Sequence, residues 1–298
     1  MSPETISASG DSIARSELPN VAKCPAINSV DDFLPAIIES AAVFPSVLPL
    51  RVDVPESQDL SKPIFVELCA GSAVMSQHMF EKGFAPLPID WHGNKQKQRM
   101  SIVKLDLSNA NQVSIIKDFV KAGSVAIVWA GIPCGTASKV REIPLADGSS
   151  GPRPLRSARF PEGLPNLNAI DALRVRKANE IYDNVAELLQ CCLYLGVDVV
   201  IENPRGSYVW LFRWYCTLLS KGLIDVDFQH CKWSCFGAMR PKWTRLRTTI
   251  KALAGMAGGC HLNHAHLGWG QDVFGQFVTA FEAEYHVDGG YSSRNYGH

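Results

Sequence analysis

"SVAIVWAGIPCGTAS", residues 124–138, is an apolar run of strand length that stops at a proline and continues into a cysteine among small residues. The run is apolar throughout and does not alternate with polar residues, which is typical of a strand buried on both faces of a sheet. Small neighbours on either side of Cys134 leave room for a flat molecule beside its sulfur. The stretch therefore predicts a central parallel strand with a partly exposed thiol at its carboxyl end.

Segments of the same texture lie on both sides of this strand. Strand-length apolar runs, at 63–69, 85–90 and 101–107, alternate with helical patterns at 73–83 and 111–123. Downstream come a long helical pattern near 170–195, a strand at 197–203, a helix at 206–222, and strand-like runs at 224–229 and 244–250. This alternation predicts an α/β fold, with a mostly parallel twisted sheet and helices on both faces.

The texture also divides the chain into three parts. Residues 1–60 are rich in Ser, Pro and Ala and are expected to form a partly disordered extension. Residues 61–250 carry the alternating pattern, interrupted at 139–168 by a Pro-, Gly- and Arg-rich loop far longer than an ordinary connection. Residues 251–298 are expected to form a short, partly disordered C-terminal segment.

Composition limits the class of protein. Hydrophobic residues make up 46% of the 298 residues, too many for a disordered chain, and 29 basic side chains balance 29 acidic ones. The N-terminus has no apolar core behind a basic start, and no run reaches the length of a membrane span. Nine cysteines at irregular spacing fit reduced thiols. We expect an intracellular protein, nuclear in a eukaryote, with no membrane partner and a monomeric state.

Polar side chains follow the predicted strands at the edge where parallel sheets bind ligands. They are Glu67, Asp90, Asp106, Cys134 and Glu202. Three acids at three successive strand ends favour a nucleoside-containing cofactor, because a carboxylate in this position can accept ribose hydroxyls. Asp90 and Asp106 alone also fit helix N-caps, and the turn after Glu67 alone also fits an ordinary tight turn. A thiol and a carboxyl at neighbouring strand ends suggest a nucleophile and its acid/base partner, whereas Cys134 alone also fits a core cysteine.

These residues together resemble the cytosine carbon-5 methyltransferases, which use S-adenosylmethionine. The resemblance rests on ordered blocks between Pro63 and Thr249: "FVELCAGSA", "PIDWHGN", "KLDL", "AGIPCGTAS", "VVIENP" and "CFGAMRPKWTRLRT". A further likeness is to divergent methylase-like segments of mobile elements. The resemblance implies a Rossmann-like methyltransferase fold and methylation of cytosine in DNA through a covalent cysteine adduct at carbon 6. It also implies that the target base is flipped out of the duplex.

The resemblance assigns roles to residues of this sequence. The implied catalytic residues are Cys134 as nucleophile, Glu202 at the ring nitrogen 3 edge, and the paired Arg245 and Arg247. The implied cofactor-binding residues are Glu67, Cys69, Ala70, Gly71, Asp90, Trp91, Asp106 and Pro133. The basic loop behind the cysteine suggests nucleic-acid contacts by Ser138, Lys139, Arg141, Arg153, Arg156 and Arg159, with a solvated loop as the alternative.

Some features depart from the family pattern. Cys69 stands where the family has a phenylalanine that stacks on adenine, and the residues after Thr249 are too few for the usual target-recognition domain, which is therefore reduced or absent. The tail holds possible zinc ligands at Cys260, His261, His264 and His266, with Cys231 and Cys235 upstream. Their spacing matches no common zinc finger, so no metal site is predicted. The alternative functions are RNA cytosine methylation, a degenerate methylase fold that binds nucleic acid without turnover, and a zinc-dependent nucleic-acid-binding module.

Overall fold

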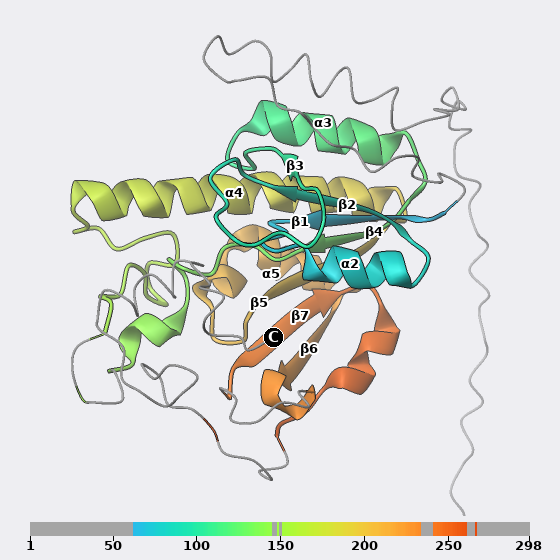
Figure 1. The fold of residues 1–298 in the computed structure, drawn as a ribbon. Coiled ribbons are helices and arrows are strands. Elements are labelled where there is room, and N and C mark those ends of the chain that lie inside the picture. The colour runs from blue at the N-terminus through green and yellow to red at the C-terminus, as the bar shows by residue number, and fades with distance from the viewer. Residues whose placement is uncertain (1–61, 145–147, 149–150, 234–240, 261–265, 267–298) are drawn as a thin grey trace, which may run out of the picture.

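The computed structural model describes residues 62–144, 148, 151–233, 241–260 and 266. Within them, one seven-stranded sheet has the order β3-β2-β1-β4-β5-β7-β6, and β7 is antiparallel to its neighbours (Figure 1). The strands are β1 (Ile64–Leu68), β2 (Ala85–Asp90), β3 (Val103–Lys104), β4 (Val125–Ala130), β5 (Asp198–Pro204), β6 (Ile224–Gln229) and β7 (Trp243–Thr248). The predicted α/β architecture is confirmed: the sheet is mostly parallel and is covered by helices on both faces.

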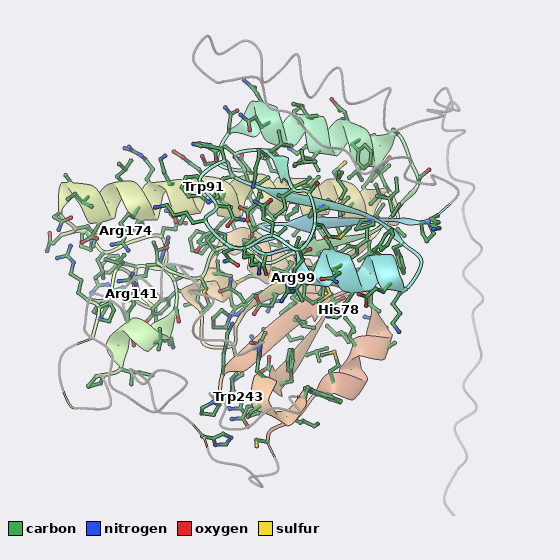
Figure 2. All side chains as sticks on the ribbon, viewed as in Figure 1. His78, Trp91, Arg99, Arg141, Arg174 and Trp243 are labelled. Carbon is green, nitrogen blue, oxygen red and sulfur yellow. The ribbon has the colours of Figure 1, made fainter. Side chains whose placement is uncertain are left out.

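Helices cover both faces of the sheet. The α-helices are α2 (Val74–Glu81), α3 (Ala110–Lys121), α4 (Ala169–Tyr194) and α5 (Arg213–Ser220), and the 3-10 helices are η2 (Lys139–Glu142), η3 (Tyr208–Leu211), η4 (His230–Trp233) and η5 (Lys251–Met256). Side chains of α3, α4 and α5 join one core cluster, whereas η5 packs on the opposite face at β6. Figure 2 shows side chains filling the space between the two helical layers and the sheet.

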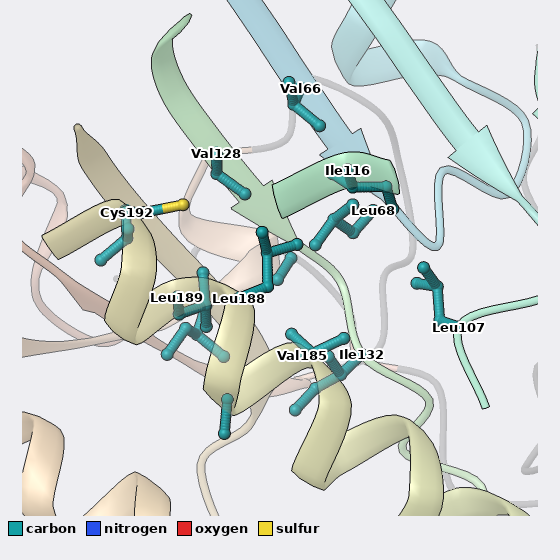
Figure 3. Close-up of a cluster of buried hydrophobic side chains, with 14 of the residues drawn as sticks. Val66, Leu68, Leu107, Ile116, Val128, Ile132, Val185, Leu188, Leu189 and Cys192 are labelled. Atoms are coloured by element: carbon teal, nitrogen blue, oxygen red, sulfur yellow. The ribbon is translucent and has the colours of Figure 1, made fainter. Parts of the chain in front are cut away.

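The main core lies between the sheet and helix α4. Val66 and Leu68 of β1 and Val128 of β4 have no exposed surface, and they face the buried Leu188 and Leu189 of α4 (Figure 3). In β4 and β5 the alternate residues point to the other face, where Val200 joins the smaller cluster under η5. Burial on both faces explains why these strands read as continuous apolar runs.

Strand β2 forms although it contains two prolines. Ala85 donates its backbone N–H to Pro63 in the chain that leads into β1, so the residues at alternating positions, Pro86 and Pro88, face the side away from β1. On that side β3 pairs only with Ile89 and Asp90. The missing proline N–H groups therefore cost no ladder hydrogen bond.

The helix predicted at 206–222 is wrong in one respect, because it is broken. The Ser207 hydroxyl accepts a hydrogen bond from the Val209 N–H at 3.3 Å and starts η3. Phe212 then adopts an extended conformation, with φ −64° and ψ 137°, before α5 begins at Arg213. The extended residue lets the buried Phe212 ring pack edge-on against Tyr182, 5.3 Å between ring centroids.

Of the three predicted parts of the chain, the structure describes mainly the middle one. The proposed extension, residues 1–60, lies outside the described residues, as does most of the segment 251–298. The described start of that segment packs on the sheet: Leu253 and Met256 lie against the cluster that contains Val226 and Phe228. Among the described helices, none is both long and apolar enough to cross a bilayer.

Candidate active site at the carboxyl edge of the sheet

The residues predicted from sequence gather at one edge of the sheet. Strands β1, β2, β4 and β5 run parallel, so the chain leaves each of them at the same edge. Glu67 and Asp90 belong to the ends of β1 and β2, and Cys134 follows β4. Glu202 lies near the end of β5, the neighbour of β4 in the sheet.

Glu67 is buried and is bound to helix α2. Its Oε2 accepts hydrogen bonds from the Ser76 backbone N–H at 2.9 Å and from the Ser76 hydroxyl at 2.5 Å. Burial raises the pKa of Glu67 above its ordinary value, although both hydrogen bonds act in the opposite direction. In this conformation the carboxylate satisfies a first-turn N–H of α2, which is a capping role.

The turn between β1 and α2 has an unusual backbone. Cys69 and Ala73 adopt left-handed conformations with φ of 57° and 58°, as does Gly71 at 57°. Non-glycine residues rarely take this conformation, and they do so most often at functional sites. Ala70 is buried beside Ala73 and Ile102. Burial, together with the nearby carboxylates of Asp90 and Glu67, raises the pKa of the Cys69 thiol, so this sulfur stays protonated.

Asp90 connects the ends of β1 and β2. Its Oδ2 accepts hydrogen bonds from the Gly71 N–H at 2.7 Å and from Asn94 Nδ2 at 2.9 Å, and its Oδ1 accepts one from the Trp91 N–H at 2.7 Å. Burial raises the pKa of Asp90, opposed by these backbone donors and by the Lys104 charge. Because Oδ1 accepts a single bond among the contacts described, it retains a lone pair for another donor such as a hydroxyl.

Trp91 presents an exposed ring beside this carboxylate. The side of Gly93 that a Cβ would occupy is covered by the Trp91 ring, at 2.3 Å from the ideal Cβ position, so a side chain there would displace the ring. Trp91 nevertheless keeps 52% of its surface exposed (Figure 2). An indole held in place on one side and open on the other can stack on a flat ligand.

Asp106 and Lys104 flank Asp90 on the outer side. The Asp106 Oδ1 accepts hydrogen bonds from the Ser108 N–H and hydroxyl, while Asn109, not Asp106, caps α3. Lys104 of β3 is the partner of Asp90 of β2 in the strand ladder. Its buried Nζ makes no hydrogen bond within the described residues. Burial lowers the pKa of Lys104. A buried ammonium without a hydrogen-bond acceptor is costly, so a ligand with acceptor oxygens or nitrogens would be stabilised here.

The Cys134 loop is a tight turn held from several sides. The Cys134 carbonyl accepts hydrogen bonds from the N–H groups of Ala137 at 2.9 Å and Ser138 at 2.8 Å, and the Tyr182 hydroxyl on α4 donates to the Pro133 carbonyl. Burial raises the pKa of Tyr182 to about 12, which keeps that hydroxyl protonated. Cys134 itself is partly exposed. The turn thus fixes the backbone on both sides of the thiol.

Two predicted phosphate contacts are instead buried in the structure. Arg156 is 1% exposed and donates to Thr136 Oγ1 at 2.8 Å, to the Pro161 carbonyl at 2.7 Å and to Asn179 Oδ1 at 2.7 Å. Arg141 is 3% exposed and donates to the Gly135 carbonyl at 2.6 Å. Both guanidinium groups therefore fasten the insert to the Cys134 turn, and neither is free to meet a phosphate in this conformation.

The other predicted phosphate contacts are arranged differently. Ser138 is buried, and its hydroxyl caps η2 at the Val140 N–H, 3.3 Å away. Arg153 is half-exposed and forms an ion pair with Asp171. Lys139 and Arg159 are exposed and lie over the rings of Tyr208 and Phe160. The part of the basic loop that remains open to solvent is therefore smaller than the sequence predicts.

Glu202 has an incompletely satisfied carboxylate. Its Oε1 is buried and accepts no hydrogen bond within the described residues, while Lys242 Nζ lies 3.5 Å from it. The next residue, Asn203, is fully buried and donates from Nδ2 to the Ile132 carbonyl at 2.8 Å. This bond fastens the end of β5 to the loop that carries Cys134, because Ile132 lies two residues before the cysteine.

Arg245 and Arg247 do not share a face of the sheet with Glu202. In the β5–β7 ladder Glu202 pairs with Leu246, and directly paired residues lie on the same face while neighbours alternate. Both arginines instead bind carboxylates of β6: Arg245 forms two hydrogen bonds with Asp227, at 2.7 and 2.9 Å, and Arg247 forms two with Asp225, at 2.6 and 2.7 Å. The end of β5 is thus fastened to the Cys134 loop through Asn203, while the guanidinium groups of both arginines are bound to β6.

A cavity of about 390 Å³ lies elsewhere, at the start of β5. Its lining includes Tyr194, Asp198 and Thr249. Since Asp198 begins β5 and Glu202 is near its end, this cavity is at the opposite edge of the sheet from the predicted site.

Several residues that shape the site are missing from the sequence-based prediction. They are Asn94, Lys104, Tyr182, Asn203 and Lys242. Asn203 carries a local signal, because it directly follows Glu202 in a strand that is otherwise apolar. Asn94, Lys104 and Lys242 lie within the quoted blocks "PIDWHGN", "KLDL" and "CFGAMRPKWTRLRT", but the prediction gives them no role. Tyr182 comes from the distant helix α4, and nothing in its immediate sequence marks it.

No protein-family model matches the chain, and no curated protein matches it. Among solved structures, the crystal structure of the S. pombe Dnmt2 methyltransferase is similar with a TM-score of 0.32 and 11% sequence identity. The match covers 63% of this chain and 50% of that chain, so it spans half the length of the solved structure.

Proposed function

We propose that this protein transfers a methyl group from S-adenosylmethionine to carbon 5 of cytosine in DNA, with Cys134 as the nucleophile. The observation that carries the proposal is the pairing of two strand ends. Cys134 follows β4, Glu202 lies near the end of the adjacent β5, and the Asn203–Ile132 hydrogen bond fastens the two together.

The residue types suit the difficulty of the reaction. Carbon 5 of cytosine is a weak nucleophile until a thiolate adds to carbon 6 and converts the ring to an enamine. The Glu202 carboxyl would bind the ring nitrogen 3 edge and stabilise its protonated form. Its Oε1, buried and without a hydrogen bond in the described residues, has the acceptor capacity that this role requires. Loss of the carbon 5 proton and expulsion of the Cys134 sulfur would restore the aromatic ring.

The residues at the ends of β1 to β3 fit an adenosyl group. When bound, S-adenosylmethionine supplies the electrophilic methyl group. Asp90 Oδ1 would accept a ribose hydroxyl, and the open face of Trp91 would stack on the adenine. The orphaned Lys104 ammonium beside Asp90 supports a ligand with acceptor atoms at this place. Five further residues that are predicted to bind the cofactor lie at this edge and stay in the proposal: Cys69, Ala70, Gly71, Asp106 and Pro133. Glu67 holds helix α2 through its hydrogen bonds with Ser76.

DNA is the substrate that the proposal names. A stacked base cannot offer carbon 6 to a thiolate, so the target cytosine must leave the stack. Exposed cations beside the Cys134 loop, Lys139 and Arg159, and the half-exposed Arg153 would meet the phosphates. Arg245 and Arg247 enter the proposal as residues that steady β7 next to β5, since their guanidinium groups bind Asp227 and Asp225.

The test measures methyl transfer and adduct formation together. Purified protein is incubated with labelled S-adenosylmethionine and duplex DNA, and separately with duplex DNA that contains 5-fluorocytosine. The fluorine blocks loss of the carbon 5 proton, so wild type should form a stable covalent adduct. Cys134→Ser should form none and transfer no label. Glu202→Gln should lower the transfer rate by about 100- to 10,000-fold.

The controls distinguish this chemistry from simple misfolding. Cys216→Ser changes an exposed cysteine and should retain transfer and adduct formation. Label incorporation that survives Cys134→Ser would remove the proposed attack. Transfer to a matched RNA but not to DNA would keep the chemistry and contradict the substrate.

A further inference from the structure

A group of cysteine and histidine side chains meets just past the carboxyl end of β6, which lies at the same edge of the sheet as the end of β5, with β7 between the two strands. Cys231 belongs to η4, Cys260 follows η5, and His266 lies further along the chain. The two sulfur atoms and an imidazole nitrogen all lie within 4.8 Å of one another. Residues that are far apart in the sequence thus converge on one point.

The backbone brings Cys260 to this point without help from the thiols. Gly258 donates its N–H to the Asp227 carbonyl at 3.0 Å and accepts from the Gln229 N–H at 3.1 Å, which extends the β6 ladder. The Cys260 N–H donates to Gln229 Oε1 at 2.7 Å. Gly258 has φ 125°, a conformation that L side chains rarely adopt. The approach of this segment to β6 is therefore set by its own glycine and hydrogen bonds.

Cys231 and Cys260 interact directly. Cys231 is buried, its thiol is hydrogen-bonded with that of Cys260, and the backbone N–H groups of Cys231 and Lys232 point at its sulfur. Lys232 is fixed nearby by a hydrogen bond from Nζ to the Ala257 carbonyl, 2.8 Å long. Two thiols in contact, with backbone donors aimed at one sulfur, form an environment in which a cation could replace the thiol protons.

The donor set selects the metal. Two thiolates and one imidazole are ligands that zinc prefers, and zinc binds sulfur at about 2.3 Å and nitrogen at about 2.0 Å. Tetrahedral geometry then places ligand atoms roughly 3.5–4 Å apart. The three ligand atoms are at most 4.8 Å apart, and small side-chain rotations would bring them to these distances. Magnesium and calcium are disfavoured because they bind oxygen ligands.

We propose that Cys231, Cys260 and His266 bind one zinc ion, which fastens the segment after η5 to the end of β6. Three protein ligands leave one position of the tetrahedron for a further ligand. The role is structural, because the ion would add bonds between η4 and the segment after η5 to the hydrogen bonds that already join this segment to β6. Its three ligands are not among the residues proposed for methyl transfer, so metal content and methyl transfer can be measured separately.

The experiment measures metal content directly. Full-length protein, purified under reducing conditions without metal-affinity resins, is analysed by elemental mass spectrometry. Wild type should carry about one zinc ion per chain. Cys231→Ser and Cys260→Ser should lose it, and His266→Ala should bind it more weakly. The matched variants Cys216→Ser and His78→Ala change an exposed cysteine and an exposed histidine, and they should retain full zinc.

A second measurement does not depend on variants that fold. X-ray absorption of the zinc in wild type should show two sulfur neighbours and at least one nitrogen neighbour. A chelator should lower the thermal midpoint of wild type, and added zinc should restore it. Protein without zinc, zinc retained in both cysteine variants, or a Cys231–Cys260 disulfide in place of zinc would each overturn the proposal.

Discussion

At the scale of single residues, Trp91 depends on a glycine two positions away. A Cβ at Gly93 would lie 2.3 Å from the Trp91 ring, far closer than non-bonded atoms approach. The ring cannot stay in place if a side chain is added there. Because the φ of Gly93 lies outside the left-handed region, its requirement for glycine comes from the ring and not from backbone strain.

This dependence gives a test of the cofactor site that leaves Trp91 itself unchanged. Gly93→Ala should displace the indole and weaken S-adenosylmethionine binding by about 5- to 100-fold, the range expected from loss of one aromatic stacking contact. Isothermal titration calorimetry measures the change. Gly255→Ala, where nothing lies within 4 Å of the new Cβ, should bind as wild type does. Equal affinity of Gly93→Ala and wild type would mean that Trp91 does not stack on the cofactor.

The positions of residues at strand ends could be predicted from sequence better than the side chains that they contact. The positions of Glu67 and Asp90 at strand ends follow from the apolar runs before them. The Ser76 donors on Glu67 and the burial of Arg156 depend on neighbours that only the folded chain brings together. An arginine in a loop rich in proline and glycine is typical of a solvated segment, and nothing in its local sequence indicates burial.

At the scale of elements, β6 and β7 are joined by alternating charges on one face. Asp225 and Asp227 of β6 pair directly with Arg247 and Arg245 of β7. The Arg247 side chain is 3% exposed and also donates to the Tyr215 carbonyl on α5 at 2.6 Å. Its guanidinium lies over the Trp210 ring, 4.8 Å from the centroid. This cation is therefore enclosed by strand, helix and ring, and Asp225 is its main counter-charge.

Removing that counter-charge should destabilise the fold. Asp225→Asn leaves a buried guanidinium without its carboxylate, and such changes cost about 3–5 kcal/mol, with the lower end expected because Asp225 is 23% exposed. Urea unfolding followed by circular dichroism measures the cost. Asp118→Asn breaks an exposed pair with Lys121, which solvent and salt screen, and should cost far less than Asp225→Asn. If both variants lose the same free energy, the ladder contributes no more than a surface pair.

Helices and strands could be predicted where the hydrophobic pattern of the sequence agrees with the packing of the folded chain. The long helix expected near 170–195 is observed at Ala169–Tyr194, and both late strands are present as β6 and β7. The break at Phe212 escaped the pattern because the residues on both sides have helical periodicity. The packing of one ring against Tyr182 decides the local conformation there, and that contact is 30 residues distant in sequence.

At the scale of the whole molecule, the sheet concentrates carboxylates at one edge. Parallel strands end together, so a chain that places an acid after each strand must bury several acids near each other. Burial raises the pKa of both Glu67 and Asp90, and each raises the pKa of the Cys69 thiol between them. The edge of the sheet where the sequence predicts a ligand site is therefore also the place where burial of negative charge costs free energy.

This cost makes stability depend on pH in a direction that can be worked out. The native state holds protons on Glu67 and Asp90 above their ordinary pKa values of 4.5 and 3.8, whereas the unfolded state releases them. Between the ordinary and the raised values the native state binds more protons, so the free energy of unfolding falls as pH rises through that interval and the loss is complete above it. Each unit of raised pKa corresponds to about 1.4 kcal/mol.

Replacing one of these acids should flatten that dependence. Glu67→Gln keeps an oxygen acceptor for Ser76 but carries no charge, so between pH 4.5 and neutrality its free energy of unfolding should fall less steeply than that of wild type. Asp90 still contributes, so part of the slope remains. Urea unfolding at several pH values measures the difference, with Glu81→Gln, at the exposed end of α2, expected to keep the wild-type slope. Parallel curves for wild type and Glu67→Gln would mean that burial of the Glu67 charge costs the fold nothing, because the Ser76 hydrogen bonds fully offset it.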